Sequence, residues 1–162
     1  MRDIGIRLPR RLPRLGGEEG TALVEFALIL PILALLLFSM LDFGKAFNYW
    51  IDETHLANEG ARWAAVNRNP GGGSLQQYIL QQATTAELRS GGTASLPAPA
   101  RVCISFPGGT ANVGDPVEVT VSATYHWLSI VTGRIGIAQT TITGSSHMRL
   151  EARPTNYAAG CS

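Results

Sequence analysis

The feature that most constrains this chain is an uncharged, strongly apolar stretch near its N-terminus. Residues 26–41 read FALILPILALLLFSML, and residues 21–24 extend the stretch upstream with only Glu25 intervening. About 20 apolar residues are enough to cross a bilayer as a helix. Pro31 lies inside the stretch, and membrane-spanning helices tolerate a proline when neighbouring groups satisfy the freed carbonyl. The pattern therefore predicts a transmembrane helix over residues 21–41.

The charges ahead of this stretch predict its orientation. Five arginines precede it, against three acidic residues. Because basic flanks stay in the cytoplasm, we expect residues 1–20 to be a cytoplasmic leader. The helix would then anchor the chain in the inner membrane, and the C-terminal domain would lie outside the cytoplasm. A conventional signal peptide has an apolar core of only about 7–15 residues before a small-residue cleavage site. The nearest such site, residues 44–46, lies among aromatic residues, so the stretch favours an anchor.

Composition and motifs argue against catalysis. The net charge is only +1, which gives no basic surface for nucleic acid. His55 and Glu59 have the spacing of metal ligands on a helix, but no second ligand pair accompanies them. His126 and His147 have no nucleophile in context, and the glycines at 71–73 lack the lysine of a phosphate-binding loop. We expect no enzyme activity, metal, cofactor, small-molecule substrate or nucleic-acid partner.

The helical pattern continues beyond the apolar stretch, over residues 42–69. A helix in this register would carry one apolar stripe that changes from aromatic to alanine and must be covered. A proline and three glycines follow Asn69 and end the helix. The stripe residues recur at alternating spacings of four and three: Phe43, Phe47, Trp50, Thr54, Ala57, Ala61 and Ala64.

Residues 70–162 predict a small outer domain that begins with a helix. Ser74 and Gln77 fit a capping box, so we expect one helix over residues 74–90. Residues 127–136, WLSIVTGRIG, are open to two interpretations, a membrane-proximal loop or a surface patch for a partner.

The rest of the outer domain has the alternation of β-strands. Apolar and polar residues alternate over about 101–106, 116–126 and 138–150. These strands follow one another without helical crossovers, so an antiparallel sheet is favoured. The fold class is α+β, with a long N-terminal transmembrane helix continuing into a small pilin-like domain.

The chain has two cysteines, Cys103 and Cys161. Outside the cytoplasm, an even count favours a disulfide, and closing this loop would stabilise the fold by roughly 4 kcal/mol. The alternative interpretation is two unpaired thiols, with Cys161 on a frayed tail.

Three blocks of sequence resemble the TadE-like family, the pseudopilins of the tight-adherence (Flp-type) pilus system. The blocks are ALVEFAL at residues 22–28, DFG at 42–44 and GAR at 60–62. The basic leader, Gly20, Glu25 and Phe26 also resemble a type IV prepilin processing site. This resemblance implies that a prepilin peptidase cleaves after Gly20 and makes Thr21 the mature N-terminus.

The resemblance also implies how the protein acts. Glu25 would pair with the free α-amine of Thr21 in a neighbouring subunit, and Phe43, Phe47 and Trp50 would join it as helix-assembly contacts. We expect a minor pseudopilin that acts structurally in pilus assembly and adhesion, with other pilins or pseudopilins and the assembly platform as partners. Two alternatives are an unprocessed, membrane-tethered periplasmic binding or scaffold module, and a secreted enzyme released by signal cleavage.

Overall fold

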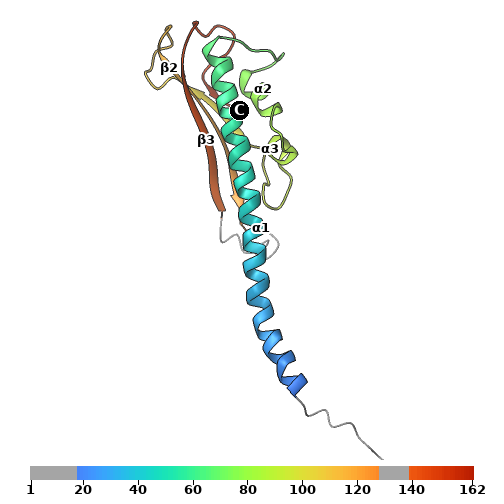
Figure 1. Cartoon of the computed structure of the whole chain (residues 1–162). Coiled ribbons are helices and arrows are strands. Elements are labelled where there is room, and N and C mark those ends of the chain that lie inside the picture. The colour runs from blue at the N-terminus through green and yellow to red at the C-terminus, as the bar shows by residue number, and fades with distance from the viewer. Residues whose placement is uncertain (1–17, 128–138) are drawn as a thin grey trace, which may run out of the picture. The chain divides into compact units, whose positions relative to one another are not determined.

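The structure is a computed structural model that describes residues 18–127 and 139–162 (Figure 1). Nearly all of the expected leader and most of the ambiguous segment at 127–136 therefore lie outside the described residues. The chain divides into two compact units, residues 1–37 and 38–162, which we describe separately. Helix α1, Glu18–Ala65, contributes residues to both.

In the first unit, α1 is helical throughout its described length and includes Pro31. Its large apolar side chains are exposed in all directions, from Leu23 to Leu37. Among the described residues, one helix is long and apolar enough to cross a membrane, and none of its most apolar window is buried within the chain. A helix that is apolar all round requires a lipid or protein environment.

The second unit combines the rest of α1 with a four-stranded antiparallel sheet of order β3-β2-β1-β4. The strands are β1, Arg101–Ser105; β2, Pro116–His126; β3, Gln139–Arg149; and β4, Gly160–Cys161. This arrangement confirms the predicted α+β class. Strand β4 has no counterpart in the sequence analysis, because two residues are too few to show an alternating pattern.

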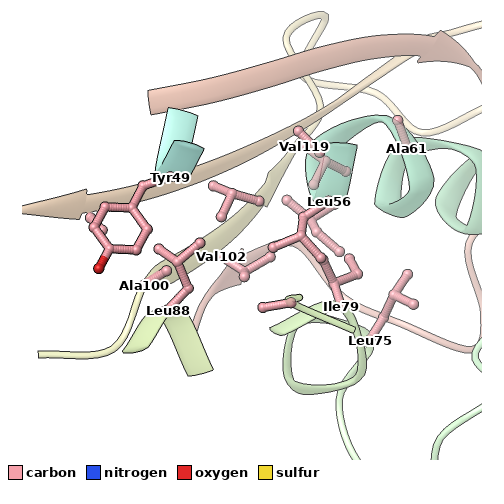
Figure 2. Close-up of a cluster of buried hydrophobic side chains, with 14 of the residues drawn as sticks. Tyr49, Leu56, Ala61, Leu75, Ile79, Leu88, Ala100, Val102 and Val119 are labelled. Carbon is pink, nitrogen blue, oxygen red and sulfur yellow. The ribbon is translucent and has the colours of Figure 1, made fainter. Parts of the chain in front are cut away.

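One face of the sheet packs against the helices and forms the core (Figure 2). Every second residue of β2 from Val117 to Tyr125 is buried, whereas the residues between them are polar and more exposed. The helices contribute Leu56 and Ala61 from α1, Leu75 and Ile79 from α2, and Leu88 from α3.

The single helix expected over residues 74–90 is wrong, because the structure has two short helices there. They are α2, Leu75–Gln81, and α3, Ala86–Ser90. Between them, the buried carboxylate of Asp52 on α1 accepts backbone N–H bonds from Thr84 at 3.0 Å and Thr85 at 3.1 Å. These N–H groups cannot also complete a continuous helix, so the chain breaks at this point.

The single stripe expected on the outer half of α1 is also wrong. Its alanine members Ala57, Ala61 and Ala64 are buried, but its aromatic members Phe43, Phe47 and Trp50 are exposed. The buried side of α1 is instead continued by other residues: Ala46, Tyr49, Asp52, Glu53 and Leu56. The helix ends at Ala65 rather than near residue 69, because Asn67 adopts a left-handed backbone conformation with φ of 52°.

The C-terminus is fixed to the sheet by a disulfide between Cys103 and Cys161. Next to it, Val102 and Ser162 exchange both backbone hydrogen bonds, at 3.0 and 3.4 Å. The cysteines therefore occupy the adjacent non-hydrogen-bonded pair, where Cα atoms lie closest, at 4.0 Å here. The bond closes a sequence separation of 58 residues.

Candidate functional site

The expected processing residues lie on the apolar part of α1. Gly20, Thr21, Glu25 and Phe26 are all helical and exposed. A side chain built at Gly20 would meet no other atom within 4 Å, so the chain itself leaves this backbone accessible. The structure gives Glu25 no hydrogen bond or ion pair with any described side chain.

Three of the expected assembly contacts, together with Ile51, form what we call the aromatic patch: Phe43, Phe47, Trp50 and Ile51. Their exposed fractions are 63%, 50%, 45% and 50%. The Phe47 and Trp50 rings lie 5.5 Å apart, and Phe43 stacks on Trp127 at 6.4 Å. The sequence analysis missed Ile51, although its spacing of four from Phe47 places it on the same side of the helix.

This part of α1 is fixed to the sheet at both ends. Near the start, the Tyr125 hydroxyl on β2 donates to the Asp42 carboxylate at 2.5 Å. Burial and the Asp42 carboxylate raise the pKa of Tyr125. At the end, the backbone N–H groups of Glu151 and Ala152 donate to the Ala65 carbonyl at 2.8 and 3.3 Å. The aromatic patch is therefore carried on a helix whose position against the sheet is set.

Between these ends lies a fully buried carboxyl group, Glu53. Neither of its oxygens has a hydrogen-bond partner among the described residues. Burial, followed by the nearby Asp52, raises the pKa of Glu53 to about 8. A side chain built at Gly144 on β3 would overlap the backbone of Glu53 and Thr54, so helix and sheet are in close contact here. No periodic signal in the sequence distinguished the buried Glu53 from the half-buried Glu59.

The described residues offer no group of three or more His, Cys, Asp or Glu side chains that could hold a metal ion. His55 is exposed and Glu59 is half-buried on α1. The arrangement suits binding between chains better than chemistry on a small molecule, since its exposed features are an apolar helix and aromatic rings.

Comparison with known families bears on the same part of the chain. The family model described as TadE-like protein matches residues 20–62, from the processing glycine to the GAR block. Over these residues the chain is similar to the TadE-like family. The match confirms the resemblance stated above, and neither a curated protein nor a solved structure matches the chain.

The TadE-like match has three consequences. It likens residues 20–62 to a pilus-associated family of the tight-adherence system, which is structural and not a known enzyme family. It coincides with the apolar part of α1, whose length and composition are those of a single-pass anchor. It also ends before the sheet begins, so the outer domain from α2 onward lies outside the matched residues.

Proposed function

We propose that this chain is a minor pseudopilin-like component of tight-adherence pilus biogenesis that acts structurally in assembly and adhesion. The observation that carries this proposal is the family match over residues 20–62, which includes both the exposed apolar helix and the aromatic patch. A chain that exposes this much apolar helix requires lipid before assembly and other helices afterwards. Other pilins or pseudopilins and the assembly platform are its partners.

The proposal includes processing by a prepilin peptidase between Gly20 and Thr21. The exposure of this segment supports it. A carboxylate within the bilayer costs about 2.5–3.5 kcal/mol on insertion scales, so Glu25 requires a compensating partner. The new α-amine of Thr21 on a neighbouring subunit supplies a cation of opposite charge. In this arrangement, the N-terminus faces the cytoplasm across the inner membrane and the outer domain lies outside the cytoplasm.

The mass of the chain purified from membranes tests the processing step. We expect a chain that begins at Thr21 in cells with active prepilin peptidase and one that begins at Met1 in cells without it. The same measurement, repeated after reduction and alkylation, reports whether Cys103 and Cys161 are bonded. A chain that keeps Met1 in peptidase-positive cells contradicts the processing step.

A second candidate is an unprocessed, membrane-tethered periplasmic binding or scaffold module. The disulfide-closed outer domain favours it, because this domain lies beyond the family match. Glu25→Ala distinguishes the two functions, with Asn48→Ala, at an exposed position on the same helix, as the control. If the chain assembles into a pilus complex, Glu25→Ala impairs pilus formation while membrane insertion is retained. If the chain is only tethered, both variants behave like the unmodified protein.

A further inference from the structure

The two edges of the sheet are treated differently. The outer edge of β1 is closed by β4, which is held by backbone bonds to Val102 and by the disulfide. Strand β3, with 11 residues, pairs with β2 on one side, and no described strand pairs with its other side. An open edge of this length is a template for another strand.

The hydrogen-bonding phase of the sheet shows which backbone groups of β3 point outward. The Val102 backbone bonds to Ser162, the residue after β4, and all three strand pairs keep a continuous register. In an antiparallel sheet, hydrogen-bonded and non-hydrogen-bonded residue pairs alternate, so this one pair fixes the bonding direction of every residue as far as β3. Leu150 bonds inward to Gly114 at 2.7 Å and Asp115 at 2.9 Å, which agrees with this phase. The residues whose N–H and C=O groups point outward are Thr141, Thr143, Ser145 and His147.

An outward backbone hydrogen bond is made only beyond the end of β3. There, Glu151 donates its N–H to the Ala65 carbonyl of α1. A cavity of about 550 Å³ lies beside this contact, between α1 and the end of β3. The residues that line it include Glu59, Arg62, Trp63, Val66, Met148 and Glu151. The open edge of β3 therefore leads into a groove with α1 as one wall.

This groove contains charged side chains that form no ion pair within the described part of the chain, and one of them, Arg68, lies over the Trp63 ring at 5.2 Å. No ion pair to a described residue involves Glu59, Arg62, Arg68 or Glu151. The buried Nε1–H of Trp63 has no acceptor among the described residues. The strand itself, QTTITGSSHMR, has no proline, lysine or bulge, which are the usual means of blocking an edge. Backbone and side-chain groups are thus available together.

We propose that the outer edge of β3 and this groove bind an extended segment of another polypeptide, which adds a fifth strand to the sheet. Main-chain hydrogen bonds to the outward residues of β3 provide the recognition. The segment alternates apolar and polar residues, as β2 does on the inner side of β3. Its apolar side chains face Val66 and Met148, and its polar side chains continue the exposed polar face of the sheet.

A second copy of this chain, paired antiparallel through β3, does not fit this edge. Such a pair would set the two α1 helices antiparallel, with the exposed apolar residues Phe38, Met40 and Leu41 of the two copies at opposite ends. One membrane cannot hold both ends. The proposal concerns only the outer domain, so it goes beyond the proposed function and does not depend on processing after Gly20.

The test uses the full chain in lipid nanodiscs and an 11-residue peptide with the sequence of β2, PVEVTVSATYH. A control peptide has the same composition with the alternation scrambled. We expect the first peptide to slow amide exchange at Thr143, Ser145 and His147 by about tenfold, and the scrambled peptide to leave it unchanged. Unaltered exchange with both peptides would overturn the proposal. This measurement needs no substitution, so it holds even where a variant fails to fold.

A matched pair of variants locates the binding at the edge. Ser145→Pro removes one outward N–H and no bond to β2, and the preceding Gly144 tolerates the restriction that proline imposes. Ser145→Ala keeps the N–H and is the control. We expect the proline variant to weaken peptide binding by about tenfold and the alanine variant to retain it. Equal binding by both folded variants, or a dimer of the full chain that excludes the peptide from β3, would overturn the proposal.

Discussion

The two lengths of helix α1 are both rich in apolar residues, but their environments differ. From Leu23 to Leu41 the large side chains are exposed on every side. From Ala46 to Ala65 one side is buried against the sheet, and most of the buried residues are small. Small residues let a sheet approach the helix closely, whereas leucine, isoleucine and phenylalanine hold it away. The size of the apolar side chains, more than their number, separates the part that the chain covers itself from the part it leaves for other partners.

The largest effect should come from one substitution made in each length of the helix. Leu56 is 1% exposed and Leu36 is 65% exposed. Leu56→Ala should lower the free energy of unfolding of the outer domain by about 2–5 kcal/mol, because it opens a cavity in the core. Leu36→Ala should change it by less than about 0.5 kcal/mol. Urea titration of the full chain in mild detergent, followed by tryptophan fluorescence, measures both. Equal losses of unfolding free energy in the two variants would show that the two lengths of the helix are not covered differently.

The next effect concerns the buried Glu53 and depends on pH. Its pKa is about 8 in the folded chain, above its ordinary value of 4.5. The unfolded chain therefore loses this proton first, so stability falls as pH rises from about 4.5 to 8, with a slope of up to about 1.4 kcal/mol per pH unit. Glu53→Gln should remove that fall and Glu59→Gln should keep it. Thermal melts over this pH range measure the change in stability. A fall in stability that persists in Glu53→Gln would contradict its assignment to Glu53.

Two glycines of α1 should respond to alanine with opposite signs. A Cβ at Gly44 would meet nothing within 4 Å, whereas a Cβ at Gly60 would lie 2.6 Å from Ile79 Cδ1. Gly44→Ala should stabilise the helix by about 0.5–1 kcal/mol through its better helix propensity. Gly60→Ala should destabilise the domain by about 1–2 kcal/mol, because Ile79 must move. Melting temperatures in one detergent compare them, and equal gains would mean that the helix and α2 are less tightly packed.

The smallest effect on stability should come from the aromatic patch. Phe47→Ser should change the free energy of unfolding by less than about 0.5 kcal/mol, because half of the ring is already exposed. If the patch contacts other helices, the same variant should reduce pilus formation in cells, and the neighbouring Asn48→Ser should not. Loss of stability without loss of assembly would place Phe47 with the buried side of α1 instead.

Much of the fold follows from local patterns. The alternation in residues 116–126 gave the central strand, and the uncharged residues before Leu41 gave the apolar helix, because each signal lies within the element itself. The break between α2 and α3 could not be predicted, since its cause is Asp52, more than 30 residues earlier in the chain.

The sequence predicted where the candidate site lies on the helix, but not which of its residues the sheet buries. Spacings of three and four placed Phe43, Phe47 and Trp50 in one series with Ala57, yet the sheet covers only the later members. Which side of a helix is covered depends on where the sheet lies, and periodicity does not record this. The burial of Glu53 likewise depends on β3, whose Gly144 brings the two backbones together.

Helix α1 is fastened to the sheet at two places, by Tyr125 near Asp42 and by Glu151 at Ala65. A force applied along the helix axis, with the sheet held, would load both attachments in shear at the same time. The outer domain should yield in one abrupt step under tension rather than peel away gradually. An optical-trap measurement that pulls on the helix would record this as a single rupture event.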